Sequence, residues 1–316
     1  MHIPASISRL PIGMVALLCA ACSPNARSSA GAQTKPAPPL EYAGEWGTKG
    51  DGPGQLKSPV RMAVDAAGNV YIADPGSGYI HKFSAAGEPL LAFQDDRRNT
   101  RPVAVAVDTG GAIYAADGET CSVFIYQPDG RRFKAIHCCA ARKGIQLALA
   151  VDQDGTIFVA DGGPMGVRKY NARGRALGAW GQQSKRQQQT ARAIVQAADL
   201  AIGPDGLVYL ADSAAGLIHV FTRDGGFQRS LRLPEGTAPA RLAGIAVTDR
   251  WVLAADPEGH VVHVWAVSGE YRLRGDLDGR LAGNADSPQD VAVTPGGELL
   301  VLDPAGGRVL RFRLHL

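Results

Sequence analysis

The sequence predicts an all-β fold, a six-bladed β-propeller of four-stranded antiparallel blades, and three observations lead to this prediction. First, six segments share one pattern: an apolar run, a turn, and a second strand that ends in Asp. Second, these aspartates lie 43, 44, 51, 44 and 47 residues apart, at Asp74, Asp117, Asp161, Asp212, Asp256 and Asp303. A period in the forties with four short strands per unit is typical of a propeller. Third, the last unit is incomplete in a way that predicts ring closure.

The residue pattern of each unit predicts four short strands, which follow one another along the chain. A short apolar run such as residues 62–64 is bounded by turn residues and predicts a buried innermost strand. The second strand is rich in β-branched and aromatic residues, the third ends in an aromatic residue, and the fourth follows a glycine turn. The sixth unit stops after its third strand. We expect residues 41–47 to supply the missing strand, which would join the termini and remove two exposed sheet edges.

The N-terminus predicts export. Residues 11–21 form an apolar run of signal-peptide length that is too short to span a bilayer. The run ends in Leu18-Cys19-Ala20-Ala21-Cys22, which resembles a bacterial lipobox. The resemblance implies a lipid on Cys22 and, with Ser23 after it, sorting to the outer membrane; an ordinary secretory signal is the alternative. We predict a signal peptide over residues 1–21, a flexible Pro/Ala/Ser-rich tether over 22–40, and the propeller over 41–316.

The charge balance and the cysteines narrow the function classes. Lys and Arg number 33 against 30 Asp and Glu, so no concentrated basic surface for nucleic acid is expected. An exported chain can form disulfides. A two-residue turn at Asp129-Gly130 places Cys121 opposite Cys138, and we predict this pair. A one-residue bulge would make Cys139 the partner, and unbonded thiols are the remaining alternative.

The first unit resembles an NHL repeat, and the resemblance extends at lower fidelity over residues 41–316. The matching residues are Gly47, Gly50, Gly52, Gly54, Leu56 and Pro59, then Ala63-Val64-Asp65, the segment from Gly68 to Asp74, and Ile80-His81-Lys82-Phe83. The Asn that follows the Ala-Asp pair in the family is mostly Gly here, and the next Arg survives clearly only as Arg308. Some NHL-like propellers resemble peptidylglycine amidating lyases, which hold zinc on the axis with histidines.

The histidines and the repeated aspartates favour structural roles. His81, His219 and His263 occupy one position in the third strands of three units, away from the axis, so they cannot converge on one metal. We predict no metal and no cofactor. The repeated aspartates are expected to accept backbone N–H bonds in their turns.

Three charged residues are the candidate site on the central channel. Arg61, Asp199 and Asp290 begin innermost strands, where alternate residues face the axis. Units six and one are neighbours after closure, so Arg61 and Asp290 are expected to pair, with Asp199 elsewhere on the ring. A purely structural ion pair is the alternative interpretation.

Two long connections share one face and are candidates for partner binding. They are residues 181–196, for which we expect a short helix, and residues 276–288, which lack the pattern of a calcium loop. The glycine-rich loop also opens there, and the face offers Leu56, Ile194 and Leu281 as apolar contacts.

The leading hypothesis is a monomeric, non-enzymatic binding or scaffolding propeller at the cell envelope, anchored to the outer membrane by lipid. It would use the face bearing the long loops and take a protein or small-molecule partner, with no nucleic acid. The alternative is an axial-site enzyme of lactonase or lyase type acting on a small molecule.

Overall fold

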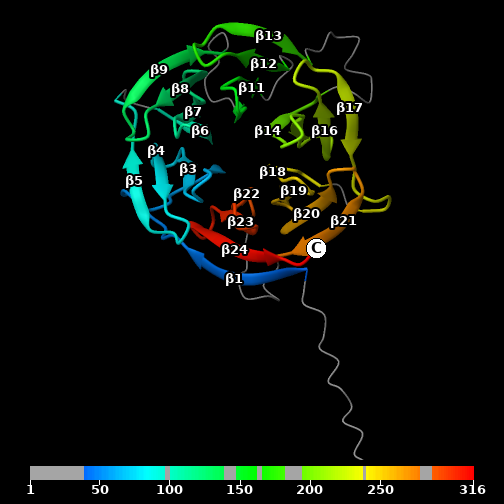
Figure 1. Cartoon of the computed structure of the whole chain (residues 1–316). Coiled ribbons are helices and arrows are strands. Elements are labelled where there is room, and N and C mark those ends of the chain that lie inside the picture. Colours follow the sequence, from blue (N-terminus) through cyan, green and yellow to red (C-terminus); the bar gives the residue numbers. More distant parts are fainter. Residues whose placement is uncertain are drawn as a thin grey trace, which may run out of the picture. The chain divides into compact units, whose positions relative to one another are not determined.

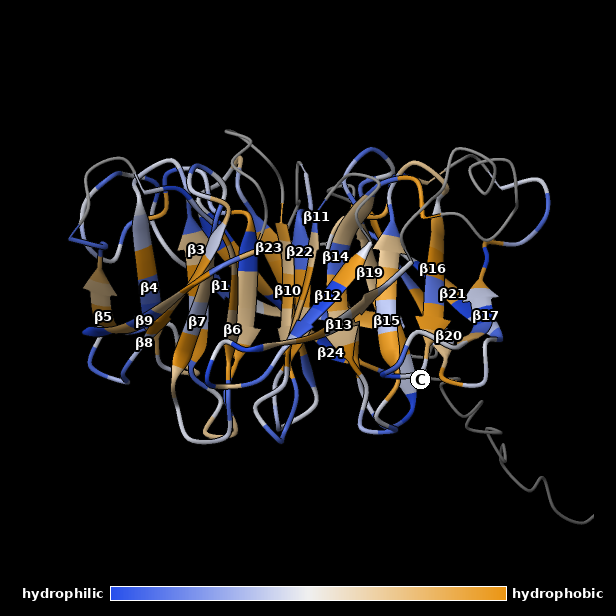
Figure 2. Ribbon diagram, turned by 90° about the horizontal axis from the view of Figure 1, so that it is seen from above, coloured by the Kyte–Doolittle hydropathy of each residue, from blue (hydrophilic) through white to orange (hydrophobic). Residues whose placement is uncertain are grey.

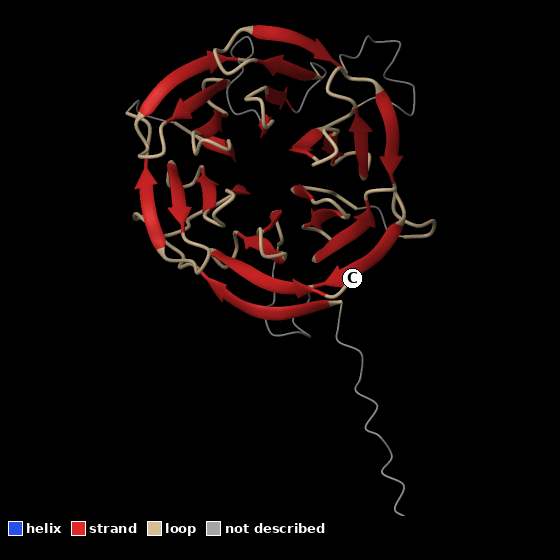
Figure 3. Ribbon diagram, viewed as in Figure 1, coloured by secondary structure: helices blue, strands red, loops and turns tan. Residues whose placement is uncertain are grey.

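The computed structural model describes residues 39–96, 100–138, 147–161, 166–181, 194–237, 240–277 and 287–316. The chain divides into two units, Met1–Pro36 and Ala37–Leu316, and the second unit contains all the described residues. These form six four-stranded antiparallel sheets arranged in a ring (Figure 1), with no helix among them (Figure 3). The predicted six-bladed β-propeller is therefore confirmed. The described residues include no helix with the length and hydrophobicity of a transmembrane span.

The blades follow one another along the chain. Blades 1 and 2 comprise β2 (Arg61–Val64), β3 (Val70–Asp74), β4 (Tyr79–Phe83) and β5 (Pro89–Phe93), then β6 (Pro102–Val107), β7 (Ile113–Asp117), β8 (Ser122–Tyr126) and β9 (Arg132–His137). Blades 3 and 4 comprise β10 (Leu147–Val151), β11 (Ile157–Asp161), β12 (Val167–Tyr170) and β13 (Ala176–Trp180), then β14 (Ala197–Ile202), β15 (Val208–Asp212), β16 (Leu217–Phe221) and β17 (Phe227–Leu231). Blades 5 and 6 comprise β18 (Ile245–Val247), β19 (Trp251–Asp256), β20 (Val261–Ala266) and β21 (Tyr271–Asp276), then β22 (Asp290–Val293), β23 (Glu298–Asp303), β24 (Arg308–Leu314) and β1 (Leu40–Trp46).

The N-terminal strand closes the ring, as predicted. Strand β1 pairs antiparallel with β24, from Leu40 opposite Leu314 to Trp46 opposite Val309. At the seam Gly47 has φ +108, and a Cβ there would lie 3.0 Å from the Gly307 carbonyl oxygen. The glycine conformation thus lets the loop pass close to the backbone of the last blade.

The hydrophobic core lies between blades, because each second strand is buried on both faces. All five residues of β3, β7 and β15 are buried, and Figure 2 shows the strands as more hydrophobic than the turns at the two ends of the ring. One cluster joins residues of blade 6, such as Leu300, to residues of blade 1, such as Ile72 and Phe83. The same contacts that fill the core therefore also hold the seam.

Among the repeated aspartates, the carboxylates of Asp74, Asp117, Asp212 and Asp256 accept backbone N–H bonds, as expected. Asp74 accepts hydrogen bonds from the backbone N–H of Lys57 (2.7 Å), Ser58 (2.9 Å) and Gly76 (3.0 Å). It therefore joins the entry of the innermost strand to the turn after the second strand. Asp212 does the same with Val195 (2.7 Å) and Gln196 (3.1 Å) in blade 4.

The three third-strand histidines each contact the aspartate of their own blade. The Nε2 to Oδ2 distance is 3.9 Å between His81 and Asp74, 3.7 Å between His219 and Asp212, and 3.5 Å between His263 and Asp256. Each histidine is buried within its blade, so the three do not converge on one point. Among the described residues no group of three His, Cys, Asp or Glu side chains is placed to hold a metal ion.

His81 makes the stability of the fold depend on pH. Its side chain is fully buried and burial lowers its pKa, an effect that the Asp74 carboxylate only partly opposes. The unfolded chain binds a proton at this histidine near pH 6.5, whereas the folded chain resists it. Stability should therefore fall as pH drops below about 6.5, by up to about 1.4 kcal/mol per pH unit. Urea unfolding of the wild type and His81→Leu across this range should show a flatter pH dependence in the variant; equal slopes would contradict this account.

The predicted Cys121–Cys138 disulfide is wrong. The two residues do face each other, since the Cys138 N–H donates to the Cys121 carbonyl at 3.0 Å. However, the buried Cys138 thiol is free and donates to the Ile136 carbonyl oxygen at 3.5 Å. Cys121 has φ +52, so its side chain does not leave the backbone in the direction of an ordinary strand residue. The alternative partner, Cys139, lies outside the described residues.

Candidate functional site: the axial channel

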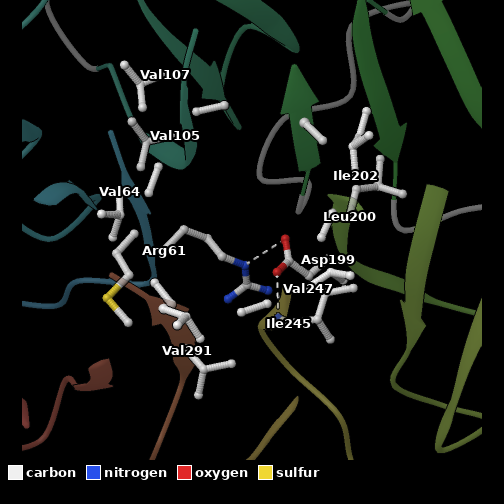
Figure 4. Close-up of a pocket in the computed structure, with 18 of the residues that line it drawn as sticks. Arg61, Val64, Val105, Val107, Asp199, Leu200, Ile202, Ile245, Val247 and Val291 are labelled. Atoms are coloured by element: carbon white, nitrogen blue, oxygen red, sulfur yellow. Dashed lines mark hydrogen bonds and ion pairs between the residues drawn. The ribbon is translucent and has the colours of Figure 1, made fainter. Parts of the chain in front are cut away.

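The six innermost strands surround a cavity of about 460 Å³ on the axis of the ring. Its walls are small or branched apolar side chains, including Val64, Val105, Val107, Val151, Leu200, Ile202, Ile245, Val247 and Val291 (Figure 4). The lining also includes the turns that join first to second strands, with Asp65, Thr248 and Pro295. The cavity therefore reaches the face that carries those turns. Arg61 and Asp199 belong to the opposite end, where the innermost strands begin.

Arg61 crosses the channel from blade 1 to blade 4. Its Nε lies 3.5 Å from Asp199 Oδ1 (Figure 4). One Nη donates to the Ala198 carbonyl oxygen at 2.7 Å, and the other donates to the carbonyl oxygen of its neighbour Val60 at 2.7 Å. The expected pairing of Arg61 with Asp290 is therefore wrong. In a ring of six, blade 4 is opposite blade 1, and the long arginine side chain reaches it. Arg61 is 3% exposed, so its charge is almost fully withdrawn from water.

Asp290 lies behind the channel wall and binds backbone instead of arginine. Its Oδ2 accepts the Met62 N–H at 2.6 Å, and its Oδ1 accepts its neighbour Val291 N–H at 2.9 Å. The first bond joins blade 6 to blade 1. Burial raises the pKa of Asp290 well above the usual value, and the negative charge of Asp199 raises it further.

Asp199 links blade 4 to blade 5 and to blade 1 on the opposite side of the ring. Its Oδ2 accepts the Ile245 N–H at 2.9 Å, which ties blade 4 to blade 5, while its Oδ1 faces Arg61. Burial raises the pKa of Asp199, and the Arg61 charge and the Ile245 hydrogen bond oppose this.

Gly244 is a further part of this site, and it occupies in blade 5 the place that Arg61, Asp199 and Asp290 occupy in their blades. A Cβ at Gly244 would lie 1.7 Å from Asp290 Oδ1 and 2.6 Å from Asp290 Cα. The Gly244 N–H also donates to Gln289 at 3.1 Å, joining blade 5 to blade 6. The only sequence signal was the break in the pattern, since the other five units carry a side chain at this place.

The site combines a cavity lined by small apolar side chains and strand backbone with charged side chains that already have partners. Both carboxylates accept backbone N–H groups of the next blade, and the guanidinium meets a carboxylate and two carbonyls. The described channel has room for a small molecule, between apolar side chains and strand backbone. Its three charged side chains hold four of the six blades together at the axis.

The predicted partner face is described only in part. Residues 182–193 and 278–286 of the two long connections, Leu281 included, lie outside the described residues. The short helix expected over residues 181–196 therefore stays a prediction. Leu56 and Ile194 were expected to offer apolar contacts, but they are 0% and 4% exposed. Both side chains instead belong to clusters between blades, which corrects that expectation.

Comparisons with known proteins agree on the fold. No protein-family model matches the sequence, and no curated protein matches it. Among solved structures, a streptogramin B lyase superposes with a TM-score of 0.64 at 12% identity, over 87% of this chain and 98% of that one. Virginiamycin B lyase from Staphylococcus aureus gives 0.60 at 12% identity, over 82% of this chain and 85% of that one. A catalytically inactive form of that lyase with quinupristin gives 0.61 at 10% identity, over 82% and 83%. The chain thus shares the six-bladed propeller fold of these lyases.

Proposed function

We propose that this chain is a non-enzymatic binding or scaffolding propeller of the bacterial cell envelope, which binds its partner on the face bearing the long inter-blade loops. The observation that carries this proposal is the engagement of the axial charges. A catalytic acid or base needs a polar atom that can reach a substrate proton. Arg61, Asp199 and Asp290 are instead bonded to each other or to the backbone of other blades, and are at most 7% exposed.

The content of bound metal tests this proposal. The mature protein, purified without chelators, should contain less than one equivalent of any tightly bound metal after dialysis, as measured by elemental analysis. Stoichiometric zinc or calcium would contradict the proposal, because it would reveal a centre able to supply Lewis-acid chemistry. The three charged side chains on the axis are buried and already have partners, so we expect no metal ion to be bound to them.

We also propose that the chain is a lipoprotein with an NHL-type propeller. The lipobox-like residues before Cys22 support the anchor, and the Gly-rich motif and Ala-Val-Asp element of the first unit support the repeat type. The tether of residues 22–39 would then link the lipid to β1.

Cys22→Ser should release the protein from the membrane fraction at high salt, because the thiol that would carry the lipid is absent. The measurement is fractionation of cells that express either chain, followed by detection of the protein in the soluble and membrane fractions. Cys138→Ser is the matched control, since it also removes a free thiol, and it should leave the distribution unchanged. Membrane association that persists in Cys22→Ser at high salt would contradict the anchor.

A lyase acting on a small molecule is the second candidate. It is favoured by the likeness to streptogramin B lyase and virginiamycin B lyase, and by an axial cavity of about 460 Å³. At 12% identity this likeness supports the fold, so an activity needs its own evidence.

A further inference from the structure

Every blade carries a β-bulge in its outermost strand, at the same place in the repeat. In blade 1, Lys82 pairs with Leu91 and Phe83 pairs with Pro89, which leaves Leu90 as the extra residue. The same reasoning gives the extra residue of each blade, from blade 1 to blade 6, as Leu90, Phe133, Leu177, Gln228, Arg272 and Ala43. A bulge bends the edge strand and presents this residue outward.

The extra residue divides the rim of the ring into two halves. In blades 1 to 3 it is large and apolar, and Leu90, Phe133 and Leu177 are 51%, 69% and 49% exposed. In blades 4 to 6 it is Gln, Arg or Ala. Strands β5, β9 and β13 follow one another along the outside of the ring (Figure 1), so the three apolar residues occupy consecutive positions on one side.

Cationic turns alternate with these apolar residues. The turn before β9 lies on β5, because a Cβ on Gly130 would lie 2.8 Å from Phe93, and it carries the exposed Arg131. The turn before β13 lies on β9, because Lys134 donates to the Arg173 carbonyl, and it carries Arg173 and Arg175. We call Leu90, Arg131, Phe133, Arg173, Arg175 and Leu177 the rim patch.

The charges of the rim patch are mostly uncompensated. Arg131 pairs with Asp129 in its own turn at 2.7 Å, and Glu88 is an exposed acid beside Leu90. Arg173 and Arg175 form no ion pair with another described residue, and their backbone N–H groups are fixed by Asn171 at 3.0 and 2.9 Å. On the other half of the rim, Arg272 pairs with Glu270 at 2.9 Å.

We propose that the rim patch is a docking surface for an anionic lipid bilayer. Aromatic and aliphatic side chains between cations suit the interface of a bilayer, where apolar side chains enter the acyl boundary and cations meet lipid phosphates. A second copy of this chain fits less well. A two-fold contact would bring Arg173 and Arg175 of both copies into one interface, and neither has an ion-pair partner among the described residues. The bulges also disrupt the free edges that strand pairing needs.

Docking by the rim would orient the ring beside the membrane, which a lipid on Cys22 would not do alone. The 18 residues from 22 to 39 could span up to about 60 Å when extended, enough to leave any side of the ring free to approach. The rim patch acts through its own side chains, so it can be tested with the lipid removed.

The test uses the full chain carrying Cys22→Ser and measures sedimentation with vesicles of phosphatidylcholine, with or without phosphatidylglycerol. Binding should require phosphatidylglycerol and weaken as salt rises. Leu90→Ser with Phe133→Ser and Leu177→Ser should lower the partition coefficient about tenfold or more. Arg173→Gln with Arg175→Gln should lower it about tenfold.

Two matched controls locate the effect on the patch. Val195→Ser removes an apolar side chain that is 58% exposed elsewhere, and Arg272→Gln with Arg274→Gln removes the same charge from the opposite half. Both should bind as the parent does, and circular dichroism should show all variants folded.

Absence of binding to anionic vesicles at low salt, or equal losses in the controls, would overturn the proposal. A dimer in light scattering that Phe133→Ser dissociates would overturn it in favour of self-association. The vesicle test does not depend on the lipid anchor, so its outcome stands whether or not the fractionation experiment shows that Cys22 carries a lipid.

Discussion

Arg61→Met is expected to destabilise the propeller by about 3–5 kcal/mol, because it leaves a buried carboxylate without its counter-charge. Asp199 would keep its hydrogen bond from Ile245 but lose the guanidinium 3.5 Å away. The Ala198 carbonyl would also lose its donor from the opposite blade. Methionine retains much of the arginine's apolar volume, so the loss reports the charge network and not an empty space.

Chemical denaturation followed by tryptophan fluorescence measures this effect. Arg241→Met is the control, because Arg241 is 60% exposed and its ion pair with Glu258 should contribute at most about 1 kcal/mol. Arg61→Met combined with Asp199→Asn should recover part of the loss, since the buried negative charge is then absent. An unfolding free energy for Arg61→Met within the error of the wild type would show that the axial ion pair does not hold the ring.

Gly244→Ala is expected to cost about 3 kcal/mol or more, because the added methyl group overlaps backbone as well as a side chain. The new Cβ would lie 2.6 Å from Asp290 Cα and 1.7 Å from Asp290 Oδ1, so rotation of the carboxylate alone cannot relieve the contact. Blades 5 and 6 would have to separate at the axis, which would also weaken the bond from Met62 to Asp290.

Gly296→Ala is the matched control for this substitution. Its Cβ would come no closer than 3.8 Å to Thr294 Oγ1, and its backbone is not in the left-handed region. Thermal unfolding should show a large drop for Gly244→Ala and little change for Gly296→Ala. Similar midpoints for the two variants would mean that the inner strands of blades 5 and 6 can separate freely, contrary to this account.

The fold was predictable because the same pattern of strands and turns occurs six times in the sequence. The spacing of the Ala-Asp pairs fixed the number of blades, and the unit ending at residue 316 required the strand at Leu40–Trp46. The turn role of Asp74 and its equivalents followed from the same repetition, and the hydrogen bonds confirm it.

The site was predictable only as a set of positions. The sequence placed Arg61, Asp199 and Asp290 at the start of inner strands, but adjacency of blades suggested the wrong partner for Arg61. The Arg61 side chain is long enough to cross the channel to blade 4, and the Asp290 carboxylate accepts a backbone N–H in place of the guanidinium. Neither contact can be predicted from the sequence pattern. The register that set Cys121 opposite Cys138 was right, but the Cys138 thiol is free, so the register did not identify the bonded pair.

The most direct test of the central claim, that this propeller binds without catalysing, is chromatography of virginiamycin B incubated with the purified wild-type protein. The binding account predicts one unchanged peak at the retention of the starting compound, as in a buffer control. A new peak that grows with protein concentration and is absent with heat-denatured protein would contradict the account and establish the lyase.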